Sequence, residues 1–408
     1  MRDETSAARG GHERAALYLA TIACYADMYV TQPILPELSR EFGVAPAQAG
    51  LTVSAVVLVI AVVSTSYGAL SDALGRKRVM VASAALLVLP TLACAAAPSF
   101  RTLLALRALQ GALIPGVVAV SVAYAGDRYP GPRLPQVVAG IMAAAVAGGL
   151  AGRVMSGPVT AAFGWRRTFV VVASFTALAA AGLARELAAA PARRRFAWRS
   201  AYGGVLAHLV DRRLVGAFLI GAALFFGWMG VFTFLPYHLA SPRYRLPTAL
   251  VSSVYLVYAA GIVASPLAGR LAGTVPPRLI MGVGLAAGAV GALATLAGPL
   301  PVVVAGLVVF VGGAYTAQAI APSFVNRSAR TAKGAANALY LSFYYVGGTF
   351  GSFLPGLAWQ RWGWPGVIAV CVTALGVAIL ADALLCGSPT GATMIITAGD
   401  EPRGRGQG

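Results

Sequence analysis

The sequence predicts an all-α polytopic membrane protein with twelve transmembrane helices, arranged as two pseudo-symmetric six-helix bundles. Three observations predict this fold: an apolar composition, twelve apolar runs of membrane-spanning length, and repetition between the two halves of the chain. Of the 408 residues, 58% are hydrophobic and 11% are charged, and the mean hydropathy is +0.77. Soluble domains carry about 25% charged residues, so this composition is that of a membrane protein and leaves no room for a substantial soluble domain.

The apolar runs, interrupted by Gly, Pro and charged residues, define the predicted spans and domains. A helix needs about 20 apolar residues to cross the hydrocarbon core, and the runs are close to that length. The spans lie near residues 15–36, 48–70, 79–97, 101–123, 136–160, 168–188, 213–238, 248–270, 278–298, 301–325, 335–358 and 365–386. The predicted domains are a cytoplasmic N-terminal segment 1–14, bundles 15–188 and 213–386, a basic cytoplasmic linker 189–212 and a cytoplasmic tail 387–408.

The two halves repeat one another in a single register. Leu35-Pro36 recurs as Leu235-Pro236, at an offset of 200, and the glycine-rich residues 148–152 recur as 347–351, at an offset of 199. The matches fall at equivalent positions of the predicted helices. They favour two parallel six-helix repeats, an arrangement of secondary transporters.

The net charge of +18 arises from 31 Lys and Arg residues against 13 Asp and Glu residues. With the N-terminus placed inside, 22 of the basic residues fall in cytoplasmic segments and seven in outer loops. This positive-inside asymmetry predicts that both termini are cytoplasmic, and it explains the basic charge without nucleic acid. In the linker, Arg193, Arg194, Arg195 and Arg199 alternate with Phe196 and Trp198, which fits either a short interfacial helix on anionic headgroups or a plain basic connection.

A charged turn between the second and third predicted spans is the most specific motif. Glycines permit tight backbone geometry, an aspartate can face a helix N-terminus, and cations hold the turn at the inner membrane surface. The motif residues are Gly68, Leu70, Asp72, Gly75, Arg76 and Lys77.

These residues resemble the signature G-x-L-x-D-x-x-G-R-K of the major facilitator superfamily. The resemblance implies that Asp72 contacts a neighbouring helix terminus and stabilises the outward-facing state. Ala73 stands where the family often has a basic residue, so one link of the family's charge network is expected to be missing.

Two charges lie at similar depth in the first and fourth predicted spans. Arg107 belongs to a segment that resembles the family's R-x-x-Q-G motif, whose arginine is linked to proton coupling. Asp27 is the only carboxylate near the middle of a predicted span. Burial favours the neutral acid and a nearby arginine favours the carboxylate, a competition that suits a switchable proton site; a static buried ion pair is the alternative.

The fifth predicted span carries Gly148, Gly149, Gly152 and Arg153. The spacing of Gly148 and Gly152 lets helices approach closely. The antiporter branch of the superfamily has a motif of the form G-P-x-x-G-G in this helix, whereas this chain places its double glycine earlier and adds Arg153. That arginine either attracts an anionic group of the substrate, reaches outward to the interface, or pairs locally.

Aromatic and amide residues of several spans are candidates for an amphipathic pocket around these charges. For each one, lipid contact or helix packing is the alternative. The candidates are Tyr25, Tyr29, Gln32, Gln110, Trp228, Gln318, Tyr340 and Tyr344.

The resemblance covers essentially the whole chain and is strongest to the twelve-helix drug:proton antiporter branch, near the bicyclomycin-resistance and arabinose-efflux permease-like proteins. It implies a monomeric inner-membrane transporter that uses alternating access and the proton gradient, with no cofactor, to export small amphipathic molecules. The alternatives are a proton symporter or uniporter importing a small polar or anionic solute and, more distantly, a non-transporting receptor or scaffold. Metalloprotease, hydrolase-elbow and Walker motifs are absent from the sequence, so we expect no enzyme and no metal site.

Overall fold

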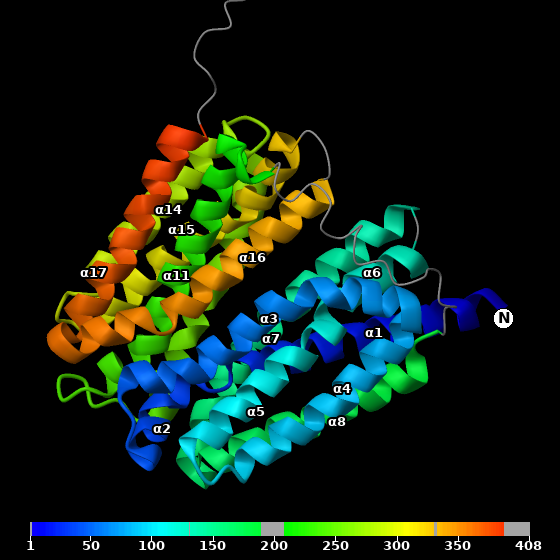
Figure 1. Ribbon diagram of the computed structural model, residues 1–408, viewed down its shortest axis with the longest axis horizontal. Coiled ribbons are helices and arrows are strands. Elements are labelled where there is room, and N and C mark those ends of the chain that lie inside the picture. Colours follow the sequence, from blue (N-terminus) through cyan, green and yellow to red (C-terminus); the bar gives the residue numbers. More distant parts are fainter. Residues whose placement is uncertain (1, 130, 189–207, 330–332, 387–408) are drawn as a thin grey trace, which may run out of the picture.

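A computed structural model describes residues 2–129, 131–188, 208–329 and 333–386, and within these ranges every regular element is a helix (Figure 1). The first bundle contains α1 Arg2–Tyr29, η1 Gln32–Ile34, α2 Leu35–Phe42, α3 Pro46–Leu74, α4 Arg76–Ala95, α5 Phe100–Leu113, α6 Pro115–Arg128, η2 Gly131–Arg133, α7 Leu134–Phe163 and α8 Trp165–Glu186. The second contains α11 Arg212–Ala240, α12 Thr248–Ser253, η3 Val254–Tyr258, α13 Ala259–Leu271, α14 Pro277–Ala294, α15 Leu300–Ser328, α16 Lys333–Gly351 and α17 Leu354–Leu385. Residues 189–207 of the linker, Ala332 and the tail 387–408 lie outside the described residues.

The helices make twelve membrane spans, as the sequence predicts. Ten stretches of the described chain are long and apolar enough to cross a membrane by themselves. Helices α1 and α16 supply the other two: each is packed inside its bundle, α1 against α7 and α16 against α11. Helix α17 holds the end of the eleventh span and the whole of the twelfth, because Gly363 reverses the chain between them with a φ of 58°.

The first span differs from its predicted extent of 15–36. Helix α1 begins at Arg2 and ends at Tyr29, after which the chain continues through η1 and α2. Pro33 has no N–H to donate to the carbonyl of Tyr29, which removes a helical hydrogen bond and favours the interruption at this point. The interruption leaves helix-end carbonyls inside the protein, where they need other donors.

Two equivalent glycine seams hold the halves internally. A Cβ added at Gly148 or Gly152 of α7 would lie 2.4 Å from a backbone oxygen of α1. A Cβ added at Gly347 or Gly351 of α16 would lie 2.0 or 2.3 Å from a backbone oxygen of α11. The internal repeat in the sequence therefore corresponds to the same backbone-to-backbone packing in both bundles.

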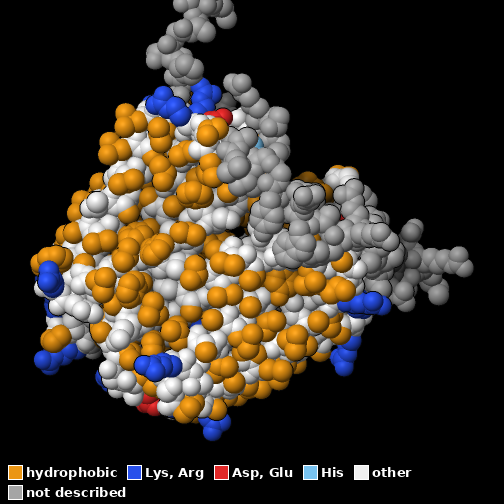
Figure 2. Space-filling view, in the orientation of Figure 1, with side chains coloured by type: hydrophobic (Ala, Val, Ile, Leu, Met, Phe, Trp, Pro, Cys, Tyr) orange, Lys and Arg blue, Asp and Glu red, His pale blue; other side chains and the backbone are white. Residues whose placement is uncertain are grey.

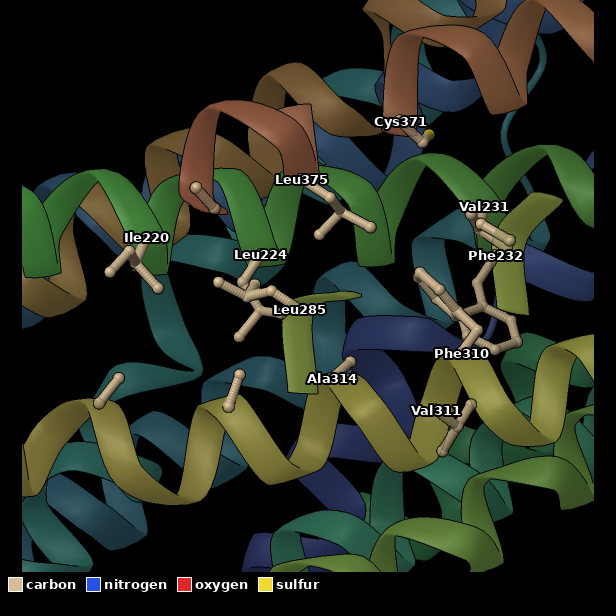
Figure 3. Close-up of a cluster of buried hydrophobic side chains, with 14 of the residues drawn as sticks. Ile220, Leu224, Val231, Phe232, Leu285, Phe310, Val311, Ala314, Cys371 and Leu375 are labelled. Carbon is tan, nitrogen blue, oxygen red and sulfur yellow. The ribbon is translucent and has the colours of Figure 1, made fainter. Parts of the chain in front are cut away.

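The apolar side chains serve both the core and the lipid-facing surface. Within the second bundle, α11, α14, α15 and α17 interdigitate around Phe232, Leu285 and Phe310 (Figure 3). On the outside, Leu178 and Leu384 are 71% and 70% exposed, and Figure 2 shows apolar side chains covering the helices, with Lys and Arg mainly near their ends. This distribution is that of a protein surrounded by lipid.

Candidate functional site: a cavity between the two bundles

A cavity of about 490 Å³ lies between the two bundles. Helices α1 and α7 of the first bundle face α11, η3, α13, α15 and α16 of the second across it. Its wall is aromatic and apolar with few polar groups, and its larger or polar residues are Tyr25, Tyr29, Met142, Arg153, Leu224, Phe225, Trp228, Tyr258, Ser265, Tyr315, Gln318 and Tyr344. The predicted candidates Tyr25, Tyr29, Trp228, Gln318 and Tyr344 are among them.

The bundles are joined at one end of this cavity, opposite the end where α1 begins and α17 finishes. We call these ends the closed side and the terminal side. On the closed side, Gln32 Nε2 donates to Thr233 Oγ1 at 3.2 Å, and Ser54 Oγ donates to the Thr349 carbonyl at 2.8 Å. Four more hydrogen bonds join the bundles there: Ser39 to Tyr237, Tyr237 to the Leu35 carbonyl, Thr248 to Glu37, and Ser252 to the Val154 carbonyl. These bonds seal the cavity against the closed side.

Arg153 is the charged residue of the described cavity wall. Its Nε donates to Gln32 Oε1 at 2.7 Å, and its Nη1 donates to the Gly149 carbonyl at 2.7 Å. The guanidinium lies over the Tyr29 ring, 3.8 Å from its centroid, and 4.8 Å from the Tyr258 centroid. Within the described ranges no carboxylate lies at ion-pair distance from it, so its charge is balanced by aromatic faces and amide or carbonyl oxygens alone.

Aromatic side chains of the second bundle line the same cavity as Arg153. The rings of Phe225 and Tyr344 are stacked with centroids 4.0 Å apart and planes within 8°. Trp228 meets Tyr258 and Tyr315 edge to face, at 4.8 and 5.1 Å. The cavity thus offers planar apolar surface beside a single cation.

Asp27 lies outside the cavity wall, fully buried in the first bundle. Its Oδ1 accepts from Gln110 Nε2 at 2.9 Å, and its Oδ2 accepts from Thr91 Oγ1 at 3.3 Å. The same Gln110 nitrogen is 2.9 Å from Thr91 Oγ1. Thr91 has one hydroxyl hydrogen, and its oxygen also lies 2.8 Å from the Leu87 carbonyl, so the firm partner of the carboxylate is Gln110.

Arg107 also lies outside the cavity, and most of its hydrogen bonds go to backbone carbonyls. It donates to the carbonyls of Asp27, Met28 and Thr52 at 2.9, 2.7 and 3.1 Å, and to Gln110 Oε1 at 2.8 Å. Its closest approach to the Asp27 carboxylate is 4.0 Å. Since α1 ends at Tyr29, Arg107 caps the interrupted end of α1, where a cation is favoured by the helix dipole.

The charged turn between α3 and α4 forms its own network on the terminal side. Gly75 adopts a φ of 92°, which a glycine tolerates and other residues rarely adopt. Arg76 binds Asp72 at 2.8 Å and Asp127 of α6 at 2.5 Å, and Lys77 donates to the Leu187 carbonyl at 2.6 Å. Gly68, unlike Gly75, has no positive φ, and a Cβ added there would have no neighbour within 4 Å.

Glu13 is a buried acid on the terminal side. It falls in the segment 1–14 and was not among the predicted sites. Glu13 is 3% exposed, accepts hydrogen bonds from Tyr124 and Tyr129, and pairs with Arg128 at 3.2 Å. Partial burial, followed by the charge of Glu13, raises the pKa of the Tyr129 phenol, so this phenol keeps the proton that it donates. The cluster ties the start of α1 to the end of α6.

The remaining predicted residues lie behind the cavity wall. Gln32 holds Arg153, Gln110 belongs to the Asp27 cluster, and Tyr340 donates to Gln318 Oε1 at 3.1 Å. Thr91 and Tyr315 are functional candidates that the sequence reasoning missed. Tyr315 could have been found from its position one helical turn before Gln318, on the same face of α15.

Comparisons with known proteins agree with this architecture. The family model described as Major Facilitator Superfamily matches residues 17–332. An uncharacterized MFS-type transporter, YybF of Bacillus subtilis, is 31% identical over 91% of this chain and 93% of its own length. The inner membrane transport protein YnfM of Escherichia coli is 33% identical, covering 90% of this chain and 88% of its own.

Solved structures share the fold at low sequence identity. A bacterial homologue of the human lysosomal transporter Spinster, inward-facing and unoccupied, aligns with a TM-score of 0.76 at 15% identity, covering 92% of this chain and 96% of its own. The nucleoside transporter NupG aligns with a TM-score of 0.76 at 13% identity, covering 91% and 99%. With the family model and relatives that match nearly the whole chain, the conclusion is that this membrane protein belongs to the Major Facilitator Superfamily of transporters.

Proposed function

We propose that this protein is a proton-coupled secondary transporter that exports small amphipathic molecules by alternating access. The observation that carries the proposal is the cavity between the bundles, sealed on one side by hydrogen bonds that cross from one bundle to the other. Rocking of the bundles would break these bonds and expose the same residues to the other side. The transported molecule would occupy the aromatic surface of that cavity.

Asp27 supplies the proposed proton site. As a carboxylate it accepts from Gln110 and Thr91, whereas the protonated acid has to donate one hydrogen bond. Thr91 Oγ1 also donates to the Leu87 carbonyl at 2.8 Å, so it can accept this bond, and protonation would reverse the hydrogen bond between Asp27 and Thr91. Gln110, which donates to Asp27 and accepts from Arg107, links the carboxyl group to that arginine. Arg107 also caps the end of α1. Asp27 lies two residues before that end, and Tyr29, the last residue of α1, lines the cavity.

This linkage would let the proton and the substrate favour different states. Coupling requires each of them to bind the two states with different affinities. Protonation at Asp27 would alter the end of α1, and the substrate would contact the same end through Tyr29. Each would then bias the conformation that the other binds.

The direction of transport rests on the proposed topology. The excess of basic residues on the terminal side favours cytoplasmic termini, which makes the conformation described here closed toward the outside. A cavity loaded from the cytoplasm suits export across the inner membrane. We propose that a monomer suffices and that the proton gradient, with no bound cofactor, is the energy source.

A drug-sensitivity and dye-accumulation panel in an efflux-deficient bacterial host tests this proposal. We expect wild type to protect against one or more amphipathic compounds and Asp27→Asn to lose that protection at equal membrane expression. Asp382→Asn is the matched control, because Asp382 is another buried carboxylate, located in α17 outside the cavity wall. Equal protection by wild type and Asp27→Asn would refute proton coupling at this residue.

Arg153 favours a second candidate, import of a small polar or anionic solute by proton symport or uniport. A cavity cation without a carboxylate partner in the described chain would serve uptake of an anion as well as its export. Proteoliposomes with an imposed pH gradient separate the two directions. Accumulation driven by an inward proton gradient would indicate symport, and accumulation driven by an outward proton gradient would indicate antiport.

A further inference from the structure

We infer that the substrate is an organic anion with a planar apolar body, whose acidic group binds Arg153. This inference rests on the proposed use of the central cavity for transport and adds the chemical class of the cargo. It holds for either direction of transport. It concerns equilibrium binding, so it can be tested without a gradient.

The charge of the cavity wall is the first argument. Among the described residues that line the cavity, Arg153 is the one that carries a charge at neutral pH. The acid that could have attracted a cationic substrate, Asp27, is fully buried behind the wall, and its Oδ1 already accepts a hydrogen bond from Gln110. The cavity therefore presents one positive charge and, within the described residues, no negative one.

The state of the Arg153 side chain is the second argument. A guanidinium has five N–H donors, and the hydrogen bonds to Gln32 and Gly149 use one at Nε and one at Nη1. The Tyr29 side chain is a further hydrogen-bond partner of the guanidinium, and none of these three partners is a carboxylate. A cation that is 2% exposed in a membrane protein normally has an acidic partner, and a substrate carboxylate or sulfonate would be that partner.

The shape of the opposite wall is the third argument. The stacked pair of Phe225 and Tyr344 and the ring of Tyr29, one face of which Arg153 covers, line one cavity. A cavity of about 490 Å³ is in the range that holds a drug-sized molecule. An aromatic acid could place its ring on these surfaces and its anionic group at Arg153.

Three probes with one skeleton and different charges provide the test: 2-naphthoate, 2-naphthamide and 2-naphthylmethylammonium. Binding to the full-length protein in nanodiscs is measured by isothermal titration calorimetry at pH 7.5. Hydrogen bonds to a charged group are worth about 1.5–3 kcal/mol, so we expect naphthoate to bind about 10- to 100-fold more tightly than naphthamide. The ammonium probe should bind most weakly of the three.

Variants then assign the preference to Arg153. Arg153→Gln should remove the advantage of naphthoate while leaving naphthamide binding intact, which also shows that the variant is folded; Arg153→Lys should retain part of it. Tyr344→Ala should weaken naphthoate and naphthamide by the same factor, and Arg101→Gln, outside this cavity, should change neither. The inference is overturned if naphthoate binds no more tightly than naphthamide, or if Arg153→Gln weakens both probes equally. The binding result does not depend on whether Asp27→Asn cells lose protection. Proton coupling at Asp27 and anion binding at Arg153 can therefore be refuted independently.

Discussion

Replacing Arg107 should lower the free energy of unfolding of the first bundle much more than replacing its carboxylate neighbour Asp27 does. The side chain makes four buried hydrogen bonds, three of them to backbone carbonyls and one to Gln110. Hydrogen bonds between membrane helices average about 0.6 kcal/mol, and ordinary protein hydrogen bonds reach about 1.5 kcal/mol. Arg107→Gln should therefore lower the free energy of unfolding by roughly 2–6 kcal/mol.

Equilibrium unfolding in mixed micelles of a mild detergent and dodecyl sulfate, followed by tryptophan fluorescence, measures this loss. Arg101→Gln is the matched control: it is the same substitution on the same helix, at an exposed arginine for which the described residues provide no ion pair. We expect it to change the unfolding free energy by less than about 0.5 kcal/mol.

Asp27→Asn makes the test discriminating. If Arg107 serves mainly as a cap for the end of α1, Asp27→Asn should cost far less than Arg107→Gln, because the carbonyl bonds remain. Equal losses in the two variants, or an Arg107→Gln loss no larger than that of Arg101→Gln, would refute the capping role. Equal losses would indicate instead that the ion pair with Asp27 is the main interaction of Arg107.

Two further predictions concern packing and closure. Gly152→Ala should destabilise the protein by at least about 1–3 kcal/mol in the same unfolding assay, since its Cβ would meet the backbone of α1, whereas Gly312→Ala, with open space around it, should be neutral or stabilising. Tyr237→Phe removes hydrogen bonds to Ser39 and the Leu35 carbonyl across the closed side and should increase thiol labelling of a cysteine introduced there. Tyr244→Phe removes a bond within one bundle and should leave the labelling unchanged; equal labelling in both variants would contradict the assigned seal.

The fold could be predicted because its main signals are local. The length of an apolar run and the side on which basic residues gather depend on the bilayer rather than on tertiary contacts. The interruption of α1 was harder to predict, since the run 15–36 is apolar over most of its length and Pro33 gives the local signal of the break. The sequence also did not predict that α1 begins before residue 15. The charge of Glu13 in this part of the helix is paired with Arg128, which is far away in the sequence.

The site was predictable in its residue types and less so in its geometry. Depth along the spans suggested that Asp27 and Arg107 lie close together, and in the structure they approach to 4.0 Å within one cluster. The sequence could not reveal that Arg107 bonds backbone carbonyls, because carbonyls are present at every residue and carry no pattern. It also left the orientation of Arg153 open, since a helix of small residues gives little indication of which face meets the cavity.

The glycine seam between α1 and α7 has a consequence for how cargo would be released. Because these helices touch backbone to backbone, Arg153, Tyr29 and Gln32 move as one piece, while Tyr258 belongs to the opposite bundle. When the bundles separate on the closed side, Arg153 keeps its amide partner but loses the Tyr258 ring, and water reaches the guanidinium. Hydration of that cation, rather than a change in its position, would then lower its affinity for an anion and let the anion leave.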